Sequence, residues 1–303
     1  MDDDRQKVRA ASLACVLPFT VANLLAAPVS YRVSDDDPRF VLGCLCIGII
    51  GAEGALHAIW CVLAPVRFAK RLAIGVAVGL VWYGAWALGY VASASLHGGP
   101  YSYHWEEIFI GLLCLPLVAI AIQSPLWFAR IWLRWRIEHR ADPARGSDDE
   151  PFQIRHLLGA TAAVAVAFSA VRLAVPGDEE DFLIAFAIGA LIAAAISLIT
   201  TVPMVMATLR GRRMLLALPV ILLLDVVAPL GFVVTLSIAL QDRLPVTIYV
   251  GFAALGYSFF AGMAAVMLVA RALGYRLAWG RHKTTMGNGD SAASGGSQDA
   301  GVH

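Results

Sequence analysis

Charged residues are scarce in this sequence. Asp, Glu, Lys and Arg together make up 15% of its 303 residues, whereas soluble proteins average about 25%. Apolar residues make up 59%, and the mean hydropathy is +0.72. This composition excludes an ordinary soluble domain and predicts an integral membrane protein.

Cysteine is also scarce, and its positions exclude a disulfide framework. The chain has five cysteines, and all of them fall inside apolar runs. Cys44 and Cys46 are two residues apart, so on a helix their side chains point to different faces and cannot act as a ligand pair. We expect the cysteines to serve as small packing residues. They are Cys15, Cys44, Cys46, Cys61 and Cys114.

The common catalytic motifs are missing. The sequence contains no H-E-x-x-H, no G-x-S-x-G and no Gly-rich G-K-[ST] loop. Glu106 and Glu107 resemble the start of the E-E-x-x-x-R motif of intramembrane CAAX-type proteases, but Gly111 occupies the arginine position. His97 and His104 are side chains that zinc accepts, but their spacing fits no closed site. The sequence therefore favours a protein that is not an enzyme, and it predicts no metal and no cofactor.

Long apolar runs dominate what is present. Crossing a hydrocarbon core of about 30 Å takes roughly 20 apolar residues as a helix, and lipid offers the backbone no other hydrogen-bond partners. A secretory signal is the alternative for the first run, but that run is long and lacks a clear A-x-A cleavage site. Eight runs satisfy the length, and they span about 10–29, 40–66, 72–95, 108–129, 157–175, 182–209, 214–240 and 246–270.

The basic residues predict the orientation of these helices. With the N-terminus in the cytoplasm, 19 of the 23 Lys and Arg residues fall on the inner side and four fall on the outer side. The fold class is therefore an all-α polytopic membrane bundle of eight helices, with both termini inside. We expect the basic inner face to contact anionic lipids of the bilayer. Nucleic acid is not expected as a partner, because the cations form no single stripe.

One long polar segment divides the chain into two halves. We expect a first membrane half at 1–129, a cytoplasmic linker with an interfacial helix at 130–156, a second membrane half at 157–283, and a disordered Gly- and Ser-rich tail at 284–303. Aligning 40–71 with 182–213 without a gap matches about five residues, which is close to chance, and a duplication of the parallel type is a hypothesis.

The second half opens with a recognisable segment, in which Phe152 and Arg155 precede Leu157 and Leu158. This segment resembles the F-x-[IL]-R-x-L-L pattern at the start of a helix in many uncharacterised multi-pass membrane proteins of planctomycete-type bacteria. The resemblance covers about 16 residues and implies a bacterial membrane protein, for which we expect the inner membrane. It implies no chemistry.

Aromatic and basic residues alternate at the end of the fourth run. We expect a helix from Pro125 to Arg140 to continue along the inner interface, with Trp at headgroup level and Arg side chains reaching toward water. A site for a lipid headgroup or a partner is the alternative. The expected interfacial anchors are Trp127, Arg130, Trp132, Arg134, Trp135 and Arg136, together with Arg155 and Arg172.

Two acids lie deep in the apolar runs. Glu53 is at the middle of the run 40–66, and Asp225 is two residues from the middle of the run 214–240. An ionised acid at that depth costs about 2.5–3.5 kcal/mol even on lenient insertion scales, so each acid is neutral or has a partner. His57 shares a helix face with Glu53, and Pro219 and Pro229 flank Asp225. These residues form the candidate intramembrane polar site, shared by both acids if their helices are neighbours.

Small residues indicate close helix packing. Gly75 and Gly79 form a G-x-x-x-G pair, and Ser258 and Gly262 form a second pair of small residues four apart. Two function classes remain open. A non-catalytic membrane scaffold or sensor is slightly favoured, and the alternative is a proton-coupled transporter or permease that uses Glu53, His57 and Asp225.

Overall fold

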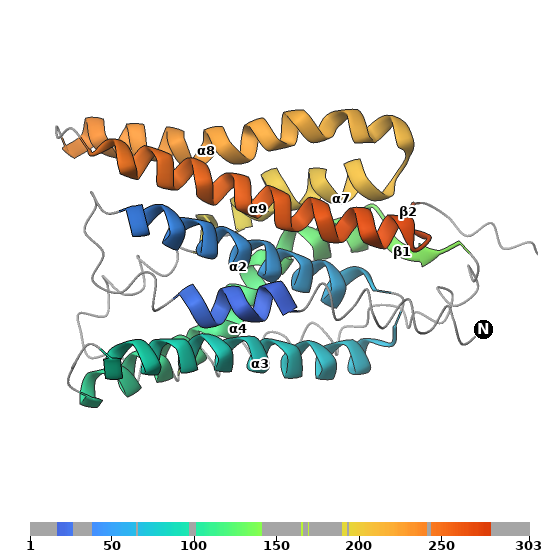
Figure 1. The fold of residues 1–303 in the computed structure, drawn as a ribbon. Coiled ribbons are helices and arrows are strands. Elements are labelled where there is room, and N and C mark those ends of the chain that lie inside the picture. Colours follow the sequence, from blue (N-terminus) through green and yellow to red (C-terminus); the bar gives the residue numbers. More distant parts are fainter. Residues whose placement is uncertain are drawn as a thin grey trace, which may run out of the picture.

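The computed structural model describes residues 17–26, 38–64, 66–96, 101–140, 165, 169, 190–192, 194–240 and 244–279 of the chain. A short helix, Leu17–Ala26, precedes the long ones. A π-helical turn, η2 (Ser197–Thr201), leads into α7, and a 3-10 turn, η3 (Arg212–Ala217), leads into α8. The α-helices labelled in Figure 1 are α2 (Pro38–Leu63), α3 (Phe68–Leu96), α4 (Tyr101–Trp132), α7 (Val202–Leu209), α8 (Leu218–Leu240) and α9 (Val246–Ala272).

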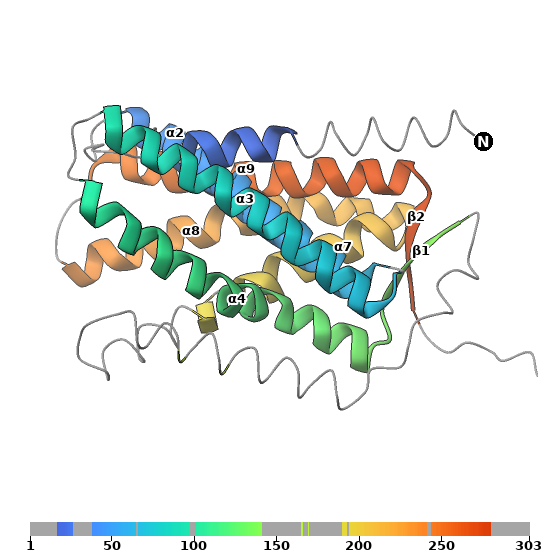
Figure 2. The ribbon, with the colours of Figure 1, turned by 90° about the horizontal axis from the view of Figure 1, so that it is seen from below.

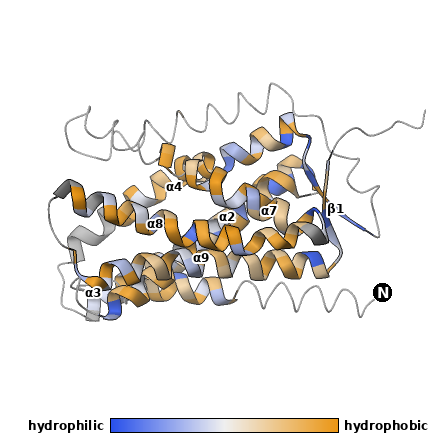
Figure 3. Cartoon of the chain, turned by 90° about the horizontal axis from the view of Figure 1, so that it is seen from above, coloured by the Kyte–Doolittle hydropathy of each residue, from blue (hydrophilic) through white to orange (hydrophobic). Residues whose placement is uncertain are grey.

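Six of the described helical stretches are long and apolar enough to cross a membrane, which confirms a multi-pass helical membrane protein. Of the first predicted run, the structure describes the short helix Leu17–Ala26. The run 157–175 lies outside the described residues apart from positions 165 and 169. Figure 3 shows apolar residues along the helices, as lipid contact requires. The six spans are Pro38–Leu63, Phe68–Ser93, Ile108–Trp132, Ala190–Leu209, Met214–Thr235 and Val246–Ala272.

Helix α9 is the centre of the packing. It packs against α2 along much of its length, and it also packs against α8 and α7, so that it lies between α8 and α2 (Figure 1). Small residues make the α2–α9 contact close: a methyl group on Gly48 would lie 2.0 Å from the Ser258 hydroxyl oxygen, and one on Gly262 would lie 3.0 Å from the Ala52 side chain. The small-residue pair Ser258 and Gly262 therefore serves helix packing, as predicted.

A two-stranded antiparallel sheet lies at one end of the bundle (Figures 1 and 2). Strand β1 (Arg136–His139) pairs with β2 (Tyr275–Ala278). The predicted helix from Pro125 to Arg140 is therefore wrong, because α4 ends at Trp132. Arg134 follows with a φ of 53°, a left-handed conformation that an α-helix cannot continue through. The chain then pairs with β2 instead of lying along the interface as a helix.

Elements that are far apart in the sequence pack against each other. Helix α2 packs against α9, and α4 packs against η2. Helices α4 and α9 are each followed by a strand within a few residues, and these two strands pair. The sheet thus joins the segments that follow α4 and α9, at the end of the bundle where α2, α4, α7 and α9 finish.

Candidate functional site

Glu53 lies in the middle of α2 and is 2% exposed. Its Oε2 accepts a hydrogen bond from the Asn23 side-chain amide, which comes from the helix Leu17–Ala26. The same amide nitrogen donates to the backbone oxygen of Phe19 at 3.0 Å, which fixes its orientation. Glu53 Oε1 has no hydrogen-bond partner among the described residues. The carboxyl group thus links two helices through one oxygen.

His57 lies one turn further along α2, but the structure gives it different partners. Its Nε2 is 3.5 Å from the Cys61 sulfur, and its ring packs edge-on against Trp82 of α3 with the ring centroids 5.6 Å apart. Gly75 allows α3 to approach here, since a methyl group at that position would lie 2.6 Å from the Cys61 sulfur. The predicted Glu53–His57 pair therefore shares a helix and not a hydrogen bond.

Asp225 is 3% exposed, and neither of its carboxyl oxygens has a hydrogen-bond partner among the described residues. It lies on α8, where Pro219 is the second residue and Pro229 is in the interior. A proline at the start of a helix is tolerated, because the missing N–H group would have no partner there. Pro229 is different, because it removes a hydrogen bond within the helix.

The two acids lie in separate contacts. A methyl group on Gly256 of α9 would lie 1.9 Å from the backbone oxygen of Asp225, which places Asp225 in the α8–α9 contact. Gly256 is not on the face of α9 formed by Ser258 and Gly262, which meets α2, because helix positions rotate by about 100° per residue. The shared site required α2 and α8 to be neighbours, whereas α9 lies between them (Figure 1).

The predicted anchors at the end of α4 differ in their surroundings. Trp132 is 74% exposed and stacks on Phe128, with the ring centroids 5.6 Å apart. Trp127 packs against Phe68, with the ring centroids 6.0 Å apart. Arg130 donates a hydrogen bond to the backbone oxygen of Val62 at the end of α2. Only some of these residues, then, are available to lipid.

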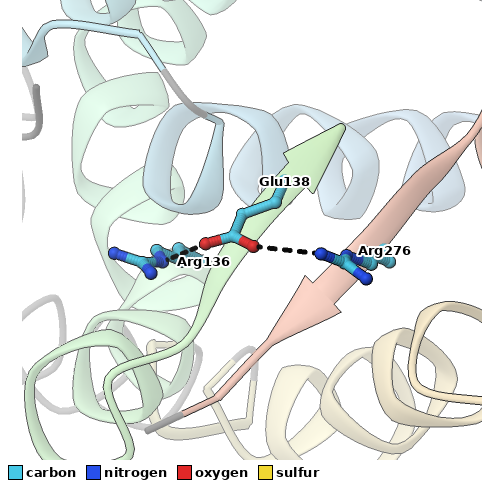
Figure 4. Close-up of polar contacts among 3 residues, drawn as sticks. All are labelled: Arg136, Glu138 and Arg276. Atoms are coloured by element: carbon cyan, nitrogen blue, oxygen red, sulfur yellow. Dashed lines mark ion pairs between the residues drawn. The ribbon is translucent and has the colours of Figure 1, made fainter. Parts of the chain in front are cut away.

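Trp135 and Arg136 belong to the sheet end of the bundle. Trp135 is 1% exposed and packs edge-on against Trp279, with the ring centroids 6.5 Å apart. The Arg136 Nε is 2.5 Å from a Glu138 oxygen, and the other Glu138 oxygen is 3.9 Å from an Arg276 nitrogen (Figure 4). Arg134 is exposed, whereas Arg155 and Arg172 lie outside the described residues.

Two further arginines hold helix ends, a role that the sequence did not reveal. Arg71 is 3% exposed and donates to the backbone oxygens of Val62 and Ala64, at 2.9 and 3.0 Å. Arg271 donates to the oxygens of Thr208 and Gly211, at 2.5 and 3.2 Å. The last carbonyl groups of a helix have no partner within it, and a cation there also offsets the helix dipole. These arginines fasten the ends of α2 and α7.

Asn23 is the other residue that sequence reasoning missed. It is a polar residue within the apolar run 10–29 and is 4% exposed. An amide inside a membrane bundle hydrogen-bonds across helices. An asparagine within that apolar run was therefore the sequence signal for a bond between helices. Its pairing with Glu53 could not be read from the sequence, because 30 residues separate the two.

No group of three or more His, Cys, Asp or Glu side chains within the described part of the chain could hold a metal ion. The four cysteines of that part, Cys44, Cys46, Cys61 and Cys114, are free. Comparisons with known proteins give no further information about the site. A scan against protein-family models, a search of curated proteins and a search of solved structures each found no match to this chain.

Proposed function

We propose that this protein is a membrane scaffold or sensor without a catalytic role. The supporting observation is the manner in which Glu53 is held. Its carboxyl group is buried and accepts a hydrogen bond from Asn23, while the preceding residue of α2, Ala52, packs closely against Gly262 of α9. A buried carboxyl group bonded across helices in a small-residue interface stabilises a bundle. In this proposal, Glu53 holds helices together and does not exchange protons.

The full architecture is part of the proposal. The chain crosses the membrane eight times as two sets of four helices, with both termini in the cytoplasm. The reciprocal packing of α2 with α9 and of α4 with η2 supports a duplication of the parallel type. The membrane is a bacterial inner membrane, and the basic sheet end faces its anionic inner leaflet. Trp132 and Arg134 contact headgroups there, and Arg155 and Arg172 anchor the helices of the second half.

Substitution of Glu53 tests the role of its proton. Glu53→Gln keeps an oxygen that accepts a hydrogen bond from Asn23 but has no ionisable proton, whereas Glu53→Leu removes both. Each variant is expressed in cells that lack their own copy of the gene, and complementation is measured together with the amount of folded protein in the membrane.

If the protein is a scaffold, Glu53→Gln should fully replace the wild-type protein in cells that lack the gene. Glu53→Leu should give less folded protein in the membrane. The proposal fails if Glu53→Gln folds and reaches the membrane at the wild-type level but does not complement, while Glu53→Asp does. That outcome would show that the ionisable proton is needed.

Proton-coupled transport is the second candidate function. The specific observation in its favour is that two buried carboxyl groups, Glu53 and Asp225, have oxygens without hydrogen-bond partners in the described part of the chain. Buried acids of this kind mark proton pathways in membrane proteins. In this function His57 would relay protons at the Glu53 site. Proton-coupled uptake into vesicles that is lost on both Glu53→Gln and Asp225→Asn would support transport over the scaffold.

A further inference from the structure

Asp225 occupies the middle of the buried face of α8. Among the described side chains of this helix, the most buried are Ile221, Asp225 and Val233, which are spaced by four and eight residues and therefore share one face. The flanking residues Leu224 and Val227 are exposed in the isolated chain, as lipid-facing residues would be. A carboxyl group thus takes the place of an apolar side chain in the stripe that packs on α9.

The backbone oxygen of Asp225 also lacks the hydrogen-bond donor that it would normally have within the helix. In an α-helix the carbonyl group of residue 225 accepts from the N–H group of residue 229, but residue 229 is proline and has no N–H group. This backbone oxygen points at Gly256 of α9, where any side chain would collide with it. The backbone oxygen of Asp225 therefore lies in the α8–α9 contact, and both carboxyl oxygens of the same residue are buried without a hydrogen-bond partner among the described residues.

No positive charge compensates Asp225 within the described part of the chain. The titratable residues of α9 are Tyr249, Tyr257 and Arg271, and Arg271 is occupied with the carbonyl groups at the end of α7. Helix α7 and the η2 turn contain no titratable residue, and Arg210, Arg212 and Arg213 come at least 12 residues before Asp225, at the sheet end. The Phe232–Phe252 ring pair adds further apolar surface to this contact.

We propose that Asp225 is a proton-binding site, separate from Glu53, and that the closed α8–α9 contact requires its protonated form. A neutral carboxyl group tolerates an apolar contact far better than a carboxylate does. Loss of the proton leaves an unpaired negative charge beside a backbone oxygen that lacks its helical donor, and α8 must then move away from α9 until water reaches both. A metal cation is a poorer fit than a proton, because Na⁺ or K⁺ would need more oxygen ligands than one residue supplies.

The first measurement is a pH titration followed by infrared difference spectroscopy on purified protein in lipid vesicles. The C=O stretching band of protonated carboxyl groups reports proton release directly. We expect a band that disappears as the pH rises, that is missing in Asp225→Asn and that persists in the matched control Glu53→Gln. Asp225→Ser replaces Asp225→Asn if the asparagine variant does not fold.

The second measurement is amide hydrogen exchange of the α8 and α9 peptides, corrected for its intrinsic pH dependence. If opening requires the loss of one proton, the protection factor falls about tenfold per pH unit above the midpoint. We expect this fall in the wild type and in Glu53→Gln, and constant protection in Asp225→Asn.

Three results would overturn the proposal. The infrared band could persist in Asp225→Asn, the protection of that variant could follow pH as in the wild type, or Na⁺ at fixed pH could remove the band. None of these results depends on whether Glu53→Gln complements. The scaffold proposal is therefore tested independently of this one.

Discussion

Substitution of Gly48 by alanine tests the packing of α2 on α9 most sharply. A methyl group at this position would lie 2.0 Å from the Ser258 hydroxyl oxygen and 2.3 Å from the backbone oxygen of Leu255. The serine side chain can rotate away, but the backbone oxygen cannot, so the two helices must separate. Overpacking of this kind costs about 1–3 kcal/mol.

Gly54→Ala is the matched control, because it lies on the same helix and nothing would be within 4 Å of its methyl group. Both variants gain the same helix propensity, about 0.8–1 kcal/mol, so the difference between them isolates the steric cost. We expect Gly48→Ala to be less stable than Gly54→Ala by about 1–3 kcal/mol, or roughly 5- to 150-fold in the unfolding equilibrium. The free energy of unfolding is measured by titration with sodium dodecyl sulfate in mixed micelles. Equal stability of the two variants would refute the packing described here.

The remaining predictions concern the sheet end and the topology. Arg71→Met should lower the free energy of unfolding by about 1–3 kcal/mol, because two helix-end carbonyl groups lose a charged donor; the exposed control Arg67→Met should change it by less than about 0.5 kcal/mol. In single-tryptophan variants, lipid-borne quenchers should quench Trp132 and spare the buried Trp135, and equal quenching would contradict their placement. Reporter fusions should place His303 in the cytoplasm and Gly98 outside, and the reverse at either position would refute the eight-helix topology.

Six of the spans could be predicted from the sequence, because each depends only on whether one apolar run is long enough to cross the bilayer. The strands β1 and β2 could not be predicted this way. Each has only four residues, and they pair across more than 130 residues of chain. The left-handed Arg134 that ends α4 also has no sequence signal, since arginine is an ordinary helix former.

The candidate site was predicted in part. The depth of Glu53 and Asp225 follows from counting residues, and both side chains are buried as their depth suggested. Their neighbours depend on which helices pack together, and the sequence did not indicate that α9 separates α2 from α8. Asn23 replaced His57 as the partner of Glu53 for the same reason, because hydrogen bonds between helices depend on tertiary packing.

The measurement that tests the central claim most directly is a double-mutant cycle between Asn23 and Glu53. The free energy of unfolding is measured for the wild type, Asn23→Leu, Glu53→Leu and the double variant. A hydrogen bond between two helices of a membrane protein predicts a coupling energy of about 0.6–2 kcal/mol between the two side chains. Additive effects, with no coupling beyond about 0.3 kcal/mol, would contradict the claim that Glu53 holds these helices together.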